Sequence, residues 1–501
     1  MVSSLNRQSR PFTPLLSLLT PDSMNREFFI NIVFLVSINL LIKPFFIFFI
    51  DRTVQNVVGA ETYGLYFALL NLTYLLQIFN DFGINSFNNR NISRHSQLLE
   101  KYFPNILVLK CFLGLLFIVL AFGVAWLFGY AIHLHLLFFI LLNQLFISFI
   151  LFFRSNISGL AMYRTDSMLS ALDKLLMILF CGILLWVSPF KEQFRIEYFV
   201  YGQTLALFLT ALIAFATIYK NLNRIRFRFN PAFLKLILKE SYPYALVFFL
   251  MMTYTRIDGV MIERLLPDGA YEAGVYASAF RLLDAGNQVG FLFAGLLLPM
   301  FSRMIKGNQV IKSLLRFSIL MIWGGAITMA TATCFYSTEI MDLLYVEATP
   351  YWGGILRYLM ISFVAISGIH IFGTLLTANG SLKELNIIFS IGVILNIIFN
   401  YFLILNIKAE GAALATVVTQ FFVLFAEIRL VMKTFNLKID STAVIRLLGF
   451  IAVLIPGAWL LENYSTIDWK YNFLINIMAG LGLAVLFKLI DIRGIKSLEW
   501  K

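Results

Sequence analysis

The 501 residues of this chain are 60% apolar and only 13% charged, whereas about a quarter of the residues in a soluble domain are charged. This composition excludes a soluble protein. Apolar runs of about 20 residues match the length that a helix needs to cross a bilayer, and they lack the alternation of an outer-membrane barrel. The net charge is +12, and the basic residues lie in the loops between apolar runs. We therefore expect these residues to set the orientation of the protein in the membrane and to contact anionic lipid of the inner leaflet, and we do not expect nucleic-acid binding.

Fourteen runs are predicted to cross the membrane as helices, because a span in lipid must satisfy its own backbone polar groups. We therefore expect an all-α integral membrane protein. The predicted spans cover residues 28–50, 62–84, 103–128, 131–153, 168–189, 197–219, 241–262, 271–300, 313–337, 351–377, 384–405, 409–433, 442–461 and 470–490.

A short repeat divides these spans into two groups. The pattern Gly-Ala, three residues, Gly, one residue, Tyr occurs from Gly59 and again from Gly269, which places Gly64 and Gly274 near the starts of the second and eighth spans. A repeat in the same orientation after six spans indicates a two-fold axis along the membrane normal. The sequence thus predicts two pseudo-symmetric six-helix lobes around a central cavity, followed by two further helices.

The predicted organisation has six parts. In order they are a cytoplasmic leader (1–26), an N-lobe (27–219), a basic linker (220–240), a C-lobe (241–433), the last two spans (442–490) and a tail (491–501).

The linker carries the pattern of an amphipathic helix. Asn230 can cap a helix that begins at Pro231, and Leu234 and Ile237 share one apolar face. Such a helix is expected to lie on the inner leaflet.

Basic residues concentrate in alternate loops, among them Arg90, Arg154 and Arg226, while the opposite loops are acidic and include Asp51 and Glu263. The positive-inside rule therefore predicts that both termini are cytoplasmic.

Three of the cations within or beside apolar spans are candidates for the cavity, because a charge there normally faces a protein interior or a wet cavity. They are Lys43, Arg256 and Arg281. Lys43 and Arg256 have similar depths in the first and seventh spans, so the two lobes would each present a cation to the cavity. The alternative is that these long side chains snorkel to the interface; it stays open for Lys43, and we favour the cavity for Arg256. Lys110 is expected to snorkel.

Neighbouring polar residues extend this candidate site. Arg256 and Asp258 are two residues apart, so they point to different sides and need partners on another span. Arg281 and Asp284 are three apart and can form a local ion pair. Asn287 continues the polar face of Asp284, which favours a position on the cavity wall.

Enzyme motifs are missing from the sequence. It has no Gly-rich phosphate loop, no HExxH and no nucleophile elbow, and its cysteines and histidines lack the spacing of metal ligands. We expect a protein that is not an enzyme and that needs no cofactor or metal.

Three segments stand out beside the fourteen spans: TRIDGVMIERL, YASAFRLLD and GAETYGLYFALLNLTYLLQIFNDFGINSFNNR. Through them the chain resembles, over residues 25–490, the bacterial polysaccharide flippases of the MOP (multidrug/oligosaccharidyl-lipid/polysaccharide) exporter superfamily. The resemblance implies two lobes around a cavity that opens alternately to each side of the bacterial inner membrane. The cargo would be undecaprenyl-pyrophosphate-linked oligosaccharide for O-antigen or capsule, moved from the cytoplasmic to the periplasmic leaflet.

The resemblance also implies partners and site residues. Cationic cavity residues serve this branch, and Lys43, Arg256 and Arg281 match in character and location. A coupling ion, proton or sodium, and other polysaccharide-assembly proteins are the expected partners.

Four alternatives remain. A lipid II flippase and a drug/cation antiporter belong to the same superfamily, and a membrane glycosyltransferase or polymerase and a membrane scaffold do not. An antiporter would be expected to carry an acidic site in its first span; this chain has Lys43 there, and its sequence suggests no interior carboxylate.

Overall fold

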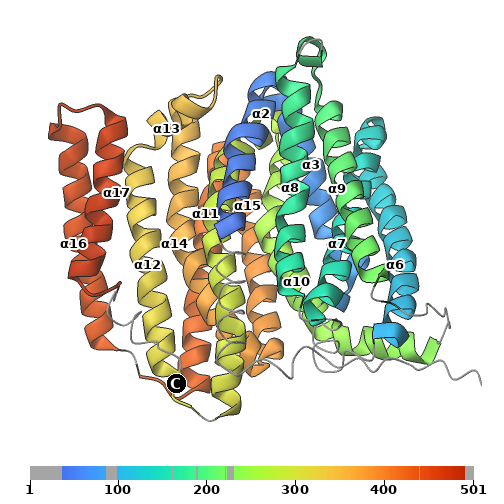
Figure 1. The fold of residues 1–501 in the computed structure, drawn as a ribbon. Coiled ribbons are helices and arrows are strands. Elements are labelled where there is room, and N and C mark those ends of the chain that lie inside the picture. Colours follow the sequence, from blue (N-terminus) through green and yellow to red (C-terminus); the bar gives the residue numbers. More distant parts are fainter. Residues whose placement is uncertain are drawn as a thin grey trace, which may run out of the picture.

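The structure is a computed structural model that describes residues 37–85, 88, 99–160, 162–187, 190–220, 222, 231–307, 309–438 and 440–490. Every regular element within these ranges is a helix, and most of the helices run side by side along one direction (Figure 1). This confirms the predicted all-α fold.

The first two spans are built from short helical pieces. A helix over residues 37–45 continues into the π-helical turn η2 (Phe46–Asp51) and then into α2 (Arg52–Val58). At Gly59 the backbone turns with a φ of 81°, a conformation that glycine adopts at little cost. α3 (Ala60–Leu75) and α4 (Gln77–Asp81) form the second span. The first span therefore continues about two turns beyond its predicted end.

Longer helices complete the N-lobe. They pack through an aromatic and aliphatic core, and two short 3₁₀ turns connect them at the end of the molecule that the sequence predicts to be outer. In order they are α6 (Leu99–Leu127), η4 (Ala131–His133), α7 (Leu134–Gly159), α8 (Tyr163–Trp186), η5 (Phe190–Gln193) and α9 (Ile196–Tyr219).

The remaining helices form the C-lobe and the C-terminal pair. They are α10 (Pro231–Leu265), α11 (Gly269–Lys306), α12 (Lys312–Phe335), α13 (Ser337–Leu344), α14 (Pro350–Asn379), α15 (Leu382–Thr434), α16 (Ser441–Tyr464) and α17 (Trp469–Leu486).

The helix count agrees with fourteen spans. Eleven helices in the described ranges are long and apolar enough to cross a membrane. One of them, α15, has 53 residues and contains two spans, because Ile407 and Lys408 depart from helical backbone angles. The first two spans, made of shorter pieces, complete the set. The protein is a multi-pass membrane protein.

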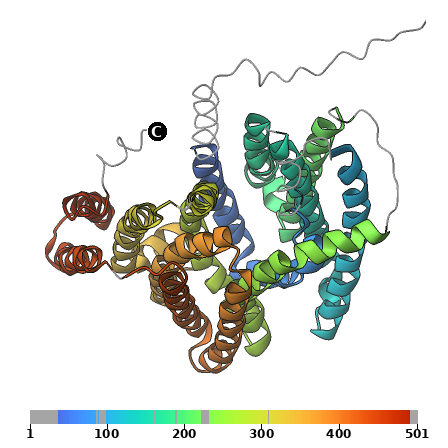
Figure 2. The same ribbon diagram turned by 90° about the horizontal axis from the view of Figure 1, so that it is seen from below.

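α10 joins the predicted linker helix and the seventh span into one element of 35 residues. Its first turns lie across the lower ends of the N-lobe helices (Figures 1 and 2). Leu234 and Ile237 pack there into a buried cluster with Phe103 and Ile106 of α6. The proposed cap, Asn230, lies outside the described residues.

The two copies of the repeat meet each other. A Cβ atom at Gly64 of α3 would lie 1.8 Å from the carbonyl oxygen of Ala270, and one at Gly274 of α11 would lie 1.9 Å from that of Ala60. Both positions thus require glycine for the two helices to approach so closely. The repeated turn is therefore one place where the lobes touch.

Further hydrogen bonds join the lobes at this outer end. Asn56 of α2 donates to the carbonyl oxygen of Leu344 (2.9 Å) and accepts from the backbone N–H of Val346 (3.1 Å). The backbone N–H of Ala60 donates to the Glu347 carboxylate at 3.0 Å. At the end of the molecule that the sequence predicts to be outer, the lobes are closed against each other in this structure.

Candidate functional site

A chain of four alternating charges crosses from the N-lobe to the C-lobe. In α11, Arg281 Nε lies 2.8 Å from Asp51 Oδ2 of the first span and donates to the Tyr63 hydroxyl at 3.1 Å, while its Nη1 lies 3.6 Å from Asp284 Oδ2. From α10, Arg256 donates to both oxygens of Asp284, at 3.1 and 3.3 Å. The four charged side chains are between 4% and 18% exposed. We call these four residues the inter-lobe charge chain.

Aromatic rings hold the two guanidinium groups. Arg256 lies 4.8 Å from the ring centroid of Phe280 and 5.2 Å from that of Tyr74, and Arg281 lies 5.6 Å from that of Phe67. Such rings favour a cation electrostatically and fix the guanidinium plane. The chain of charges is neutral as a whole, and each arginine keeps donors suited to a phosphate or carboxylate.

Asp258 points away from Arg256, on the other side of α10. It is 1% exposed and accepts hydrogen bonds from the hydroxyls of Tyr276 (2.7 Å) and Thr416 (2.6 Å) and from the amide of Asn400 (2.7 Å). Asn400 also donates to Asn396 at 3.0 Å. This polar cluster joins α10 and α11 to both spans of α15.

Lys43 lies in the N-lobe, away from this charge chain. It is half-buried, and the charges that act on it belong to Asp173, Lys174 and Arg154 of α7 and α8. The first span packs against α8 at this level, where Asn39 donates to Ser170 at 2.8 Å. The structure thus brings Arg256 and Arg281 together through Asp284 and places Lys43 in a different charged environment.

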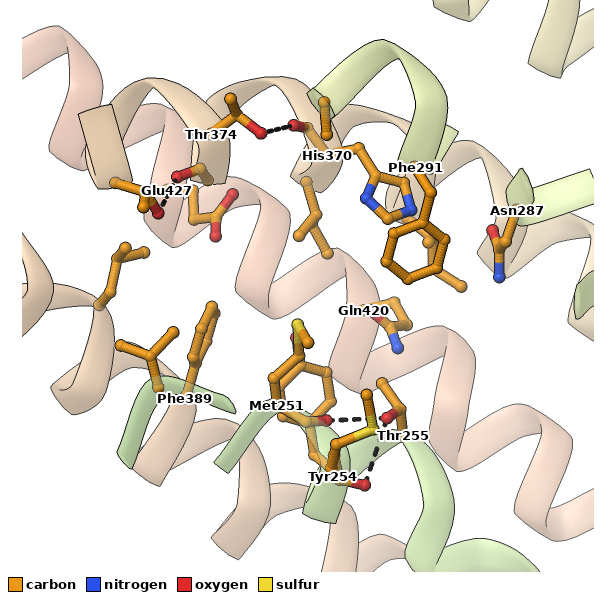
Figure 3. Close-up of a pocket in the computed structure, with 18 of the residues that line it drawn as sticks. Met251, Tyr254, Thr255, Asn287, Phe291, His370, Thr374, Phe389, Gln420 and Glu427 are labelled. Carbon is orange, nitrogen blue, oxygen red and sulfur yellow. Dashed lines mark hydrogen bonds between the residues drawn. The ribbon is translucent and has the colours of Figure 1, made fainter. Parts of the chain in front are cut away.

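A cavity of about 400 Å³ lies inside the C-lobe, lined by α10, α11, α14 and α15 (Figure 3). Of the residues that the sequence singled out, Arg256, Asp284 and Asn287 line it. The described residues of its wall all come from the C-lobe, whereas the sequence predicted a cavity between the lobes. Lys43, Asp258 and Arg281 are not on this wall.

Sequence reasoning missed two carboxylates and misjudged a lysine. The sequence predicts Asp51 in an outer loop, because it follows an apolar run, but the structure buries it in the continuing helix. Glu427 was overlooked near a predicted span end and is 0% exposed. The argument against an antiporter from the lack of interior carboxylates is therefore wrong. Lys110 does not snorkel: it is 1% exposed and lies 2.6 Å from Asp81.

Solved structures with the same fold are transporters and flippases. The lipid II flippase MurJ in an inward closed conformation matches with a TM-score of 0.66 and 15% identity, over 94% of this chain and 99% of that one. An inward-facing multidrug resistance MATE family transporter of the MOP superfamily matches with a TM-score of 0.59 and 14% identity, over 80% of this chain and 99% of that one. A MOP superfamily transporter from Pyrococcus furiosus matches with a TM-score of 0.59 and 14% identity, over 81% of this chain and 96% of that one. This chain thus shares its fold with these transporters and flippases.

Sequence comparison defines the family within that fold. The profile of the polysaccharide biosynthesis protein family matches residues 29–305. The chain belongs to this family, and all four residues of the inter-lobe charge chain, which come from three spans, lie within the match. No curated protein sequence matches the chain.

Proposed function

We propose that the protein is a flippase that moves undecaprenyl-pyrophosphate-linked oligosaccharide from the cytoplasmic to the periplasmic leaflet for O-antigen or capsule synthesis. It resides in the bacterial inner membrane with both termini in the cytoplasm. Its two lobes rock about their contact to expose the substrate site to each side in turn. Within the superfamily, the fold is equally compatible with lipid II as cargo, and the experiments below separate the two.

The observation that carries the proposal is the pair of partly buried arginines at the lobe contact. A diphosphate headgroup cannot enter hydrocarbon unaided, whereas the polyprenyl tail can stay in the lipid. Arg256 and Arg281 offer two planar guanidinium groups in a polar strip, and guanidinium binds phosphate oxygens in pairs. In this structure Asp51 and Asp284 occupy these donors.

We infer that the diphosphate replaces the contact between Arg281 and Asp51. Asp51 belongs to the N-lobe, while Arg256, Arg281 and Asp284 belong to the C-lobe. Separation of the lobes therefore leaves the C-lobe group with one net positive charge. An anionic cargo compensates that charge, and an empty protein has no compensation. Outward opening would thus be favoured only when cargo is bound.

Asp258 is the group that we propose to bind the coupling ion, proton or sodium. Within the described residues it has no cationic partner, and the nearby side-chain oxygen Oδ1 of Asn400 is buried without a hydrogen bond. Asp258, Asn396, Asn400 and Thr416 supply carboxylate, amide and hydroxyl oxygens, which are hard ligands suited to sodium. A carboxylate alone suffices for a proton. Transport that depends on sodium in the wild type and loses this dependence in Asp258→Asn identifies sodium; transport driven by a pH gradient alone identifies the proton.

Export in cells tests the cargo. In a strain that lacks its flippase but retains the cognate glycan locus, we expect Arg256→Ala and Arg281→Ala to abolish surface glycan at wild-type membrane levels. Arg357→Ala is the matched control, because this exposed arginine of α14 lies outside the charge chain and, among the described residues, donates to the Cys334 carbonyl oxygen. Unaltered export by both arginine variants, Arg256→Ala and Arg281→Ala, refutes the proposal. Rescue of a strain depleted of its lipid II flippase, without glycan export, would identify lipid II as the cargo.

A further inference from the structure

The C-lobe cavity adjoins the inter-lobe charge chain at one end. Arg256 and Asp284 belong to both, because they line the cavity and pair with each other at 3.1 Å. The ring of Phe280, whose centroid lies 4.8 Å from the Arg256 guanidinium, is also on the cavity wall. A ligand whose phosphate is bound by Arg256 can therefore place its neighbouring group in the cavity.

Two amide side chains line this part of the cavity. Asn287 follows Asp284 by one turn of α11, and among the described residues nothing donates a hydrogen bond to its buried Oδ1 atom. Gln420 of α15 is 2% exposed and lies between Thr255 and Phe291 on the wall (Figure 3). A buried amide oxygen without a donor is unfavourable. The cavity therefore favours a ligand that brings O–H or N–H donors.

The rest of the wall narrows the class of ligand. It is largely apolar and includes Met251, Phe291, Leu385 and Phe389, and the volume of about 400 Å³ is near the lower end of the range of small-molecule sites. An acyl chain would cover the apolar wall and leave the Asn287 oxygen without a donor. A sugar unit suits both parts, because the C–H groups of its ring pack on aromatic side chains while its hydroxyl groups donate to amide oxygens.

We propose that the C-lobe cavity receives the sugar unit that is linked directly to the diphosphate, and that Asn287 and Gln420 determine which sugar is accepted. The inference rests on the proposed function and adds the class of group that the C-lobe recognises, a neutral sugar with hydroxyl or acetamido donors. Because the cavity is small, the remaining sugars of the cargo stay outside it. The protein would then select its cargo by the first sugar and tolerate changes further along the glycan.

Equilibrium binding to the purified full-length protein, measured by microscale thermophoresis, tests this inference with four lipids. Undecaprenyl pyrophosphate is compared with the same lipid carrying glucose, galactose or N-acetylglucosamine. We expect at least one of the three sugar-bearing lipids to bind the wild type about tenfold more tightly than the lipid without sugar. The ratio of these two affinities is the readout, because it separates recognition of the sugar from recognition of the diphosphate.

Variants of the two amides should lower this ratio. We expect Asn287→Leu and Gln420→Leu each to reduce it to about threefold or less, because leucine has a similar size and cannot pair with a sugar hydroxyl. Arg256→Ala should weaken all four lipids alike. Asn406→Leu is the matched control and should leave the ratio unchanged, since Asn406 is an exposed residue of α15 that is not on the cavity wall and donates to the carbonyl oxygen of Phe402.

A further variant keeps the test decisive if neither amide variant folds. The Thr255 hydroxyl donates to carbonyl oxygens of its own helix, so Thr255→Leu narrows the cavity without removing a partner of the sugar, and it too should lower the ratio. The inference is overturned if the wild type binds all four lipids equally, or if none of the three variants lowers the ratio. Failure of the wild type to bind any of the four lipids would instead overturn the proposed function on which the inference rests.

Discussion

The contact between Asp51 and Arg281 gives the sharpest prediction about how the lobes move. Asp51→Asn removes the only N-lobe charge of the inter-lobe charge chain and leaves a side chain of nearly the same shape. Arg281 keeps Tyr63 at 3.1 Å and Asp284 at 3.6 Å. The free energy lost with the Asp51–Arg281 contact is therefore smaller than the cost of leaving a buried charge wholly uncompensated. We expect a loss of about 2 kcal/mol, which is typical of one hydrogen bond to a charged group.

The outer-closed arrangement bears the whole of this loss, because the contact exists only when the lobes meet. A change of about 2 kcal/mol multiplies the ratio of open to closed molecules by about thirty. Spin labels at Val57 and Val346, which are 47% and 83% exposed on the two lobes, report the distance between the outer ends of the lobes by double electron–electron resonance spectroscopy. The three native cysteines are first replaced by serine.

We expect the labelled wild type without cargo to show the short distance and Asp51→Asn to shift strongly towards a longer one. Undecaprenyl pyrophosphate should shift the wild type in the same direction. Asp268→Asn is the control, since Asp268 pairs with Lys408 inside the C-lobe. Identical distance distributions in wild type and Asp51→Asn would refute the reasoning.

Two further variants test the packing that positions the site. Gly64→Ala places a methyl group 1.8 Å from the Ala270 carbonyl oxygen, so the helices must separate; we expect a lower Tm and a longer distance between the outer labels, and an unchanged Tm would contradict the close approach. Lys110→Met leaves Asp81 without its ion-pair partner at 2.6 Å; because Asp81 is 21% exposed, we expect about 1–3 kcal/mol of destabilisation, measured as a lower Tm, with wild-type distances between the outer labels. A variant as stable as the wild type would show that the buried pair is not stabilising.

The sequence predicted the features that depend on local chemistry. Hydropathy placed the spans in the described residues, because the bilayer sets a minimum length for each, although the first span continues beyond its predicted end. The repeat identified Gly64 and Gly274, and the structure gives the reason: each glycine meets the backbone beside the other. Spacing along a helix also showed that Arg281 and Asp284 share a face.

Features set by contacts between distant segments could not be predicted in the same way. Asp51 and Arg281 are 230 positions apart, and nothing near Asp51 distinguishes a buried carboxylate from one at a membrane surface. Glu427 was missed for a similar reason, because its burial comes from α14 and α10. Lys110 was judged from its depth alone, and its partner, Asp81, lies on another span.

Flipping by the purified protein in liposomes tests the central claim most directly. Undecaprenyl-pyrophosphate-linked oligosaccharide is placed in the inner leaflet, and its arrival outside is measured by cleavage with an added glycosidase. The wild type should move the lipid, and Arg256→Ala and Arg281→Ala should move it no faster than protein-free liposomes, while Arg357→Ala behaves as the wild type. Wild-type rates in both arginine variants would contradict the account.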